Sequence, residues 1–187
     1  TSVERPGGRP VNPVLKDGAV IQDLSEPLLS LTHEAGGFFS MTVYNDGSVG
    51  RPAADPSQPG NITWKGTTGI YTGGLIFGTG ERSMVNGLLG SFRSIDHSLV
   101  TDFKNVESYF GEGFSADDHF SHISHAEFTD ETAAQPYGMR VIQKSMSSTA
   151  HAYAYLRYGF INTTAETVRG FYAGLFMDWD VYSYISN

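Results

Sequence analysis

The fold class is decided by His151-Ala-Tyr-Ala-Tyr-Leu-Arg-Tyr-Gly-Phe-Ile-Asn162, a polar Thr-Thr-Ala-Glu-Thr link, and Gly170-Phe-Tyr-Ala-Gly-Leu-Phe-Met-Asp-Trp-Asp-Val181. Aromatic residues, which suit the pleated surface of a sheet, recur through both runs. The pattern predicts two long strands joined by a polar turn. It therefore indicates a β protein.

The first of these runs has two distinct faces, because successive side chains of a strand point to opposite sides. Alternate residues from Ala152 to Phe160 share one face, and Tyr153, Tyr155 and Arg157 share the other. Both faces carry large side chains. We therefore expect a central strand of a two-layer sandwich with both faces covered.

Glycines punctuate two earlier strand-like segments. Phe38–Tyr44 is β-branched and aromatic, and the following Asn45-Asp-Gly47 supplies the positive φ angles that a tight turn needs. Gly69–Gly78 contains the paired glycines Gly73 and Gly74, which indicate a bulge or a close backbone approach.

A further strand is predicted at Tyr137–Met146, with Val141 and Ile142 at its centre. With the runs near 150–162 and 170–180, it predicts a meander of three consecutive antiparallel strands. The fold class is therefore all-β, an antiparallel β-sandwich. The given sequence ends soon after the last predicted strand. We therefore expect that the sheet could be incomplete at its C-terminal end.

The 187 residues are enough for one domain with a substantial core. Residues 1–13 contain prolines and glycines that oppose a regular ladder, so we interpret them as a linker or extended arm. Residues 14–187 are expected to form a single β-sandwich domain. The segment 105–131 is acidic, aromatic and irregular, and no regular element is assigned to it.

Composition excludes several classes of function. The net charge of −8 opposes nucleic-acid binding, which needs a concentrated Lys/Arg face. The absence of cysteine excludes disulfides, thiolate metal sites and cysteine nucleophiles. No apolar run approaches the roughly 20 residues that span a bilayer. Thr1 in place of Met indicates a processed or excised piece of a longer protein.

Catalytic motifs are also missing from the sequence. It contains no Gly-x-Ser-x-Gly elbow, no Ser-x-x-Lys, no phosphate-binding loop and no His-Glu-x-x-His. We therefore expect no enzyme activity, although a carboxylate pair for glycoside hydrolysis has no sequence signature that would reveal or exclude it.

The densest polar segment spans Asp117 to Glu127 and contains His119, His122 and His125. These histidines are candidate ligands of a transition metal. Their spacing matches no zinc motif, and on a strand His119 and His125 would share a face while His122 points away. The alternative is that they form hydrogen bonds within loops.

Asp178-Trp179-Asp180 is a candidate calcium site, because a strand would place both carboxylates on one face. Two carboxylates are fewer than the six to eight oxygens that calcium prefers. The alternative is that both acids bond to loop amides while Trp179 belongs to the core.

Exposed aromatic rings could bind a polysaccharide by stacking on its sugars. The candidate ligand-binding residues are Trp64, Tyr71, Tyr153 and Tyr155. The alternative is that these rings fill the core, as most aromatic residues of a sandwich do.

One ordered set of segments resembles a known family: Met41–Gly50, Gly73–Gly78, Asp102-Phe103, Gly138–Gln143, Leu156–Asn162 and Phe171–Asp180. It is similar to a non-catalytic region of large secreted bacterial proteins, often found beside subtilisin-like peptidase domains or ahead of C-terminal sorting modules. The resemblance covers about residues 38–181. It implies a β-rich architecture and export to the outside or the cell surface. No subtilisin triad motif is present, so peptidase activity is not carried over.

The leading hypothesis is thus a non-catalytic accessory domain of an exported bacterial multidomain protein, with neighbouring domains of the same polypeptide as its partners and no cofactor. The second is a carbohydrate-binding or carbohydrate-processing module. The third is a metal-dependent enzyme that uses His119, His122 and His125.

Overall fold

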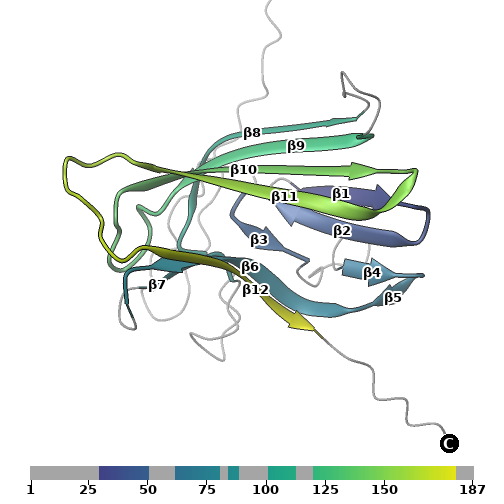
Figure 1. Cartoon of the computed structure of the whole chain (residues 1–187), viewed down its shortest axis with the longest axis horizontal. Helices are drawn as coiled ribbons and strands as arrows, with labels where there is room; N and C mark the ends of the chain where they lie inside the picture. Colours follow the sequence, from purple (N-terminus) through teal and green to yellow (C-terminus); the bar gives the residue numbers. More distant parts are fainter. Residues whose placement is uncertain (1–29, 51–61, 81–83, 89–100, 113–119, 180–187) are drawn as a thin grey trace, which may run out of the picture.

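The computed structural model describes residues 30–50, 62–80, 84–88, 101–112 and 120–179. These residues form β-strands and no helix, and the strands make two antiparallel sheets that face each other (Figure 1). The all-β prediction is confirmed. None of the described residues belongs to a helix that is long and apolar enough to cross a membrane.

Sheet A contains eight strands, six of which follow in the order β12 (Tyr172–Trp179), β6 (Ile70–Gly78), β3 (Ser48–Val49), β2 (Phe39–Tyr44), β4 (Ile62–Trp64) and β5 (Thr67–Thr68). Two more strands join it, β1 (Ser30–Ala35) on β2 and β7 (Met84–Asn86) on β6. Sheet B contains four strands, in the order β11 (His151–Asn162), β10 (Met139–Ser148), β9 (His122–Thr129) and β8 (Lys104–Glu112).

The predicted turn after β2 is confirmed. Gly47 has a φ of 78°, which favours glycine, and it lets the chain reverse into β3. The Asp46 carboxylate closes the turn by accepting hydrogen bonds from the Ser48 backbone N–H at 3.1 Å and from the Ser48 hydroxyl at 2.5 Å.

The paired glycines of β6 are also explained. A Cβ atom on Gly74 would lie 2.5 Å from the backbone oxygen of Gly87, and one on Gly73 would lie 2.7 Å from Met177 Sδ. Gly73 and Gly74 pair with β3 on one side and β12 on the other. Of the two alternatives that the sequence indicates, a bulge or a close backbone approach, the close approach is present at these glycines, on the strand next to the edge strand β12.

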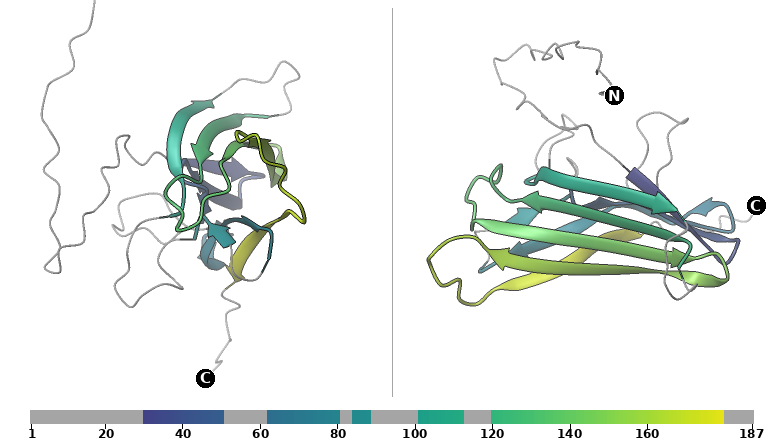
Figure 2. Two further views of the ribbon diagram at one scale, coloured as in Figure 1. Left: turned by 90° about the vertical axis from the view of Figure 1, so that its left-hand side faces the viewer. Right: turned by 90° about the horizontal axis from the view of Figure 1, so that it is seen from above.

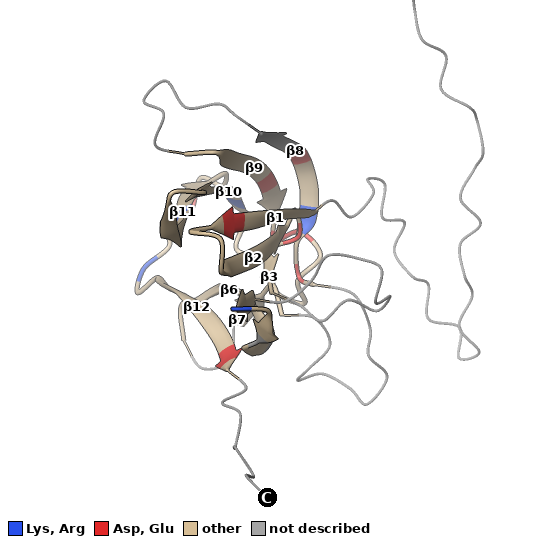
Figure 3. Ribbon diagram, turned by 90° about the vertical axis from the view of Figure 1, so that its right-hand side faces the viewer, with Lys and Arg blue, Asp and Glu red and all other residues tan. Residues whose placement is uncertain are grey.

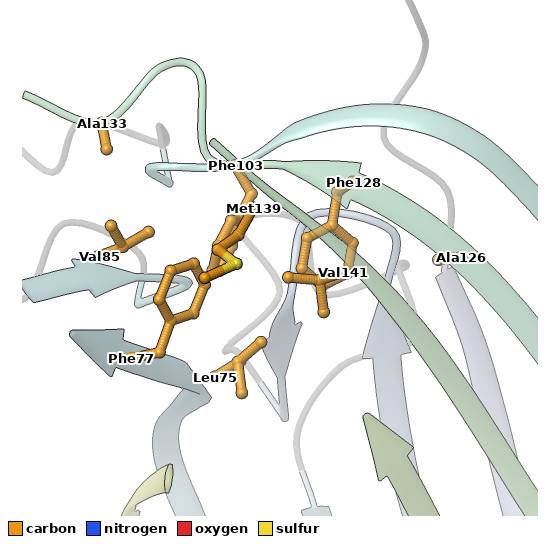
Figure 4. Close-up of a cluster of buried hydrophobic side chains, with 9 residues drawn as sticks. All are labelled: Leu75, Phe77, Val85, Phe103, Ala126, Phe128, Ala133, Met139 and Val141. Atoms are coloured by element: carbon orange, nitrogen blue, oxygen red, sulfur yellow. The ribbon is translucent and has the colours of Figure 1, made fainter. Parts of the chain in front are cut away.

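The main hydrophobic cluster lies between the two sheets at one end of the sandwich (Figure 4). Phe77 of β6 is at its centre, with ring centroids of Phe103, Phe160 and Phe171 at 5.6–5.7 Å. Its buried members are Leu75, Phe77, Val85, Phe103, Ala126, Phe128, Ala133, Met139 and Val141.

A second cluster fills the space between sheet A and β11. Its buried members are Met41, Val43, Val49, Ile62 and Ile70, and the partly buried Ala154, Leu156 and Met177 pack against them. Ala154 and Leu156 belong to the β11 face predicted to point inward. The predicted alternation of β11 is therefore correct on this face.

The predicted meander is wrong in its third strand. β10 and β11 pair antiparallel as expected, but β12 pairs with β6 in sheet A (Figures 1 and 2). Residues 163–171 separate β11 from β12, which is longer than the usual two to five residues of a hairpin loop. This link is long enough to carry the chain from one sheet to the other.

The prediction of β11 as a central strand is wrong as well. β11 is the edge of sheet B, and Tyr153 and Tyr155 on its outer face are 48% and 50% exposed. Because β12 pairs in sheet A and not beside β11, no described strand covers this edge of sheet B. The same crossover makes β12 an edge of sheet A.

Gly74→Ala tests the close approach in sheet A. We expect it to lower the free energy of unfolding by about 2–4 kcal/mol, because the new methyl group meets backbone that cannot rotate away. Urea denaturation measures the change. Gly174→Ala on the neighbouring β12 is the matched control, since its Cβ would meet only Ile76 at 3.8 Å. Equal effects of the two substitutions on the free energy of unfolding would contradict a close backbone approach at Gly74.

Candidate functional site

The most concentrated polar arrangement in the described residues is buried between the sheets, around His33 of β1. His33 lies on the inward face of sheet A and is fully buried. Its Nδ1 is 3.0 Å from Ser147 Oγ, and its Nε2 is 2.6 Å from Ser145 Oγ. Both serines belong to β10 of sheet B, so the imidazole joins the two sheets.

Two residues of β9 extend this arrangement. Ser124 Oγ is hydrogen-bonded to Ser145 Oγ, and His122 Nδ1 lies 3.4 Å from Ser147 Oγ. The rings of His33 and His122 meet edge to face with centroids 6.4 Å apart. We call His33, His122, Ser124, Ser145 and Ser147 the His33 cluster.

Strand alternation positions the serines of the cluster. Ser145 and Ser147 are two residues apart on β10, so both point inward, and Ser124 pairs with Ser145 in the ladder between β9 and β10. A second polar bond lies nearby, where Gln143 Nε2 donates to the backbone oxygen of Tyr44 at 3.0 Å. Hydrogen bonds of side chains therefore hold β1 and β2 against β10.

His33 is neutral at neutral pH. Burial, and secondarily the positive charge of His122, lowers the pKa of His33 from 6.5 to about 4. A neutral imidazole has one N–H donor and one acceptor nitrogen, and serine hydroxyls can supply the complementary partner to each. The two serines can therefore satisfy both nitrogens of the neutral ring, and burial disfavours the charged form.

A serine within 2.6 Å of a histidine is also the geometry of an activated nucleophile. Here both His33 and Ser145 are 0% exposed, so a substrate cannot reach the serine oxygen. The His33 cluster therefore acts as a structural connection between the sheets rather than as a catalytic pair.

A second polar group lies on the outer face of sheet B. Arg140 donates through Nε to Glu127 Oε2 at 2.6 Å and also through Nη2, and His125 Nε2 lies 3.1 Å from Glu127 Oε1. The hydrogen bonds from Arg140 are the main cause that lowers the pKa of Glu127. Glu127 stays ionised and both of its oxygens are occupied.

The structure separates the histidines of the predicted metal site. His122 points inward to the His33 cluster, whereas His125 points outward to Glu127, so these two side chains do not converge on one ion. His119 lies outside the described residues. Among the described residues, no three His, Asp or Glu side chains gather in a way that would hold a metal ion.

The predicted calcium pair is described only in part. Asp178 is exposed near the end of β12, and Asp180 lies outside the described residues. Trp179 is 56% exposed on an edge strand, which corrects the expectation that it belongs to the core.

The predicted aromatic residues do not form one surface. Tyr153 and Tyr155 lie side by side on the outer face of β11, and the ring of Tyr153 is stacked on His151 at 5.9 Å. Trp64 is 51% exposed at the end of β4 in sheet A, in an edge-to-face contact with Phe38 at 4.7 Å. The side chain of Tyr71 lies outside the described part of the chain.

Sequence reasoning missed the centre of the site. His33 was not predicted as a site residue, because a single histidine in an apolar strand matches no sequence motif. The alternation Leu31, His33, Ala35 was the available signal, since it places the imidazole on the same face as two apolar residues. Its serine partners lie far away in the sequence.

No protein-family model matches this chain, and no match was found among curated proteins or among solved structures. An assignment of function therefore depends on the geometry of the chain itself.

The His33 cluster predicts a specific dependence of stability on pH. Between pH 6.5 and about 4 the unfolded chain binds a proton at His33 that the folded chain does not. Stability from this residue is therefore complete above pH 6.5 and falls by about 3 kcal/mol as the pH decreases to 4. Urea denaturation across this range measures the change.

His33→Gln should flatten this part of the pH profile, because the titrating group is gone. The matched control is His151→Gln, which removes an exposed histidine of β11 and should keep the wild-type slope. If both variants kept the same slope as the wild type, the role of His33 would be contradicted.

Proposed function

We propose that this chain is a non-catalytic accessory domain that packs against a neighbouring domain of the same polypeptide. The observation that supports it is the open side of the sandwich, where β11 ends sheet B and β12 ends sheet A (Figure 2). The two edge strands lie on the same side of the molecule. Between them, apolar side chains that face the core remain accessible.

The accessible residues are on β12. Met177 packs against the second hydrophobic cluster, which identifies the inward face of the strand, and Leu175 and Trp179 share that face. Leu175 is 39% exposed although its partner Leu75 on β6 is 2% exposed. Trp179 is 56% exposed although its partner Ile70 is fully buried. Exposed apolar groups of this kind often mark an interaction surface.

Among the described residues, β12 lacks the usual protection of an edge strand. Exposed edge strands generally carry charged residues or proline, which prevent pairing with other chains. The only charged residue of β12 is Asp178, near its end (Figure 3). An edge strand with exposed apolar side chains and a single charged residue suits a permanent contact with another domain, in which a further strand or a loop covers β12.

The proposed setting is an exported bacterial protein, either secreted or held at the cell surface. This setting is the one expected from the sequence motifs within residues 38–181. In that setting the open side would face the domain that precedes or follows this chain.

Tryptophan fluorescence tests the proposal, because the chain contains two tryptophans. In Trp64→Phe, with any tryptophan outside these 187 residues also replaced by phenylalanine, Trp179 is the only reporter. Acrylamide quenching of Trp179 should decrease by about half or more when this chain is part of its complete reading frame, compared with the chain alone, since interface cores exclude solvent.

Trp179→Phe is the control, and the remaining Trp64 on β4 should be quenched equally in the two proteins. Equal quenching of Trp179 in both would contradict the proposal. A complete reading frame that adds no folded domain to this chain would contradict it too.

A second candidate function is carbohydrate binding, favoured by Tyr153 and Tyr155. The two residues are two positions apart on β11, so their Cα atoms are about 7 Å apart and their side chains share one face. Both are half exposed. Such a pair offers adjacent rings on which the apolar faces of two sugars can stack.

Titration with a panel of soluble polysaccharides tests this second function. We expect Tyr153→Ala combined with Tyr155→Ala to weaken binding, whereas Tyr172→Ala, which removes a 73% exposed tyrosine from β12, should not. Absence of any binding up to millimolar sugar concentrations would exclude carbohydrate binding.

A further inference from the structure

The outer face of sheet B carries two cations that face each other. Lys144 of β10 and Arg157 of β11 are direct cross-strand partners, and both are exposed. Side chains in such positions have Cβ atoms about 5 Å apart, and like charges there destabilise a sheet. The pair therefore lowers the stability of the isolated fold unless a negatively charged group lies close to both side chains.

The described carboxylates of this face do not supply that negative group. Glu127 is occupied by Arg140 and His125, and Glu131 is paired with Lys104. Glu107 of β8 lies two strands away from Lys144, which is about 10 Å. Within the described residues, no ion pair includes Lys144 or Arg157.

Aromatic rings continue from this pair along β11. Tyr155 precedes Arg157 by two positions and Tyr153 precedes Tyr155 by two, so all three share the outer face. The ring of Tyr153 is stacked on that of His151 with an interplanar angle of 10°. The edge strand thus presents a row of exposed rings that ends at two positive charges.

We propose that this face binds an acidic polysaccharide, a polymer of sugar rings that carry carboxylates. Tyr153 and Tyr155 stack against the rings, and Lys144 and Arg157 pair with the carboxylates, where the guanidinium can bind both oxygens of one group. The inference rests on the second candidate function and adds the class of ligand to it.

A nucleic acid fits this surface less well. Stable binding to its closely spaced phosphates normally uses several cations, often 6–10 contacts. Here two unpaired cations stand on a chain with a net charge of −8. A polysaccharide with one carboxylate on each sugar ring matches this surface, which offers two cations beside two aromatic side chains.

Polygalacturonate and its methyl ester give a direct test, because they share a backbone and differ in charge. We expect the acidic polymer to bind at least about tenfold more tightly than the ester, and the difference to shrink as NaCl rises and screens the charges. Isothermal titration calorimetry measures both affinities.

Two double variants with equal change of charge locate the site. K144Q/R157Q should remove the preference for the acidic polymer. K65Q/R169Q, which alters the turn between β4 and β5 and the link between β11 and β12, should keep it. The melting temperature of K144Q/R157Q should not fall, because the substitution relieves repulsion between like charges.

Four results would overturn the inference. Equal affinity for the two polymers, with loss of both in Y153A/Y155A, would retain carbohydrate binding but reject an acidic ligand. Loss of the preference in K65Q/R169Q as much as in K144Q/R157Q would reject the site. Tighter binding of a single-stranded oligonucleotide than of polygalacturonate would reject the class of ligand. Absence of binding by any polysaccharide would reject the carbohydrate function itself.

Discussion

The hydrogen bonds of His33 are the constraint on which the packing of the two sheets depends. They join β1 of sheet A to Ser145 and Ser147 of sheet B, in the part of the interior that is lined by polar side chains. A buried hydroxyl without a partner costs roughly 1–3 kcal/mol, so each member of the cluster requires the others. The two sheets can therefore meet in one register only.

The interior thus consists of two hydrophobic clusters and the polar His33 cluster, and each contributes differently to the packing of the sheets. The cluster around Phe77 closes one end of the sandwich by burial of aromatic rings. The cluster around Val43 joins sheet A to β11 but leaves the inward face of β12 only partly covered. The His33 cluster lies between β1 and β10, and it specifies how these elements align without adding much apolar burial.

The same polar core explains which elements can be recognised from the sequence. β2 and β11 have apolar or aromatic residues on their inward faces, and their positions were predicted within a few residues. β10 was predicted from its central Val141 and Ile142, although Gln143, Ser145 and Ser147 make most of its inward face polar. β9 presents His122, Ser124, Ala126 and Phe128 to the interior, so half of its inward face is polar and its alternation is hidden. β8 and β9 therefore went unassigned, because the pattern used to find strands assumes an apolar core.

The sequence alone determined the class of fold, the turn at Gly47 and the two faces of β11, and at Gly73 and Gly74 it indicated a bulge or a close backbone approach. These are local properties, set by strand alternation and by the φ angles that glycine tolerates. The tertiary structure decided that β12 crosses to sheet A, that β11 and β12 become edges, and that His33 meets two serines more than a hundred positions away. Such contacts depend on which sheets pack together, and a residue carries no local mark of a partner that is distant in the chain.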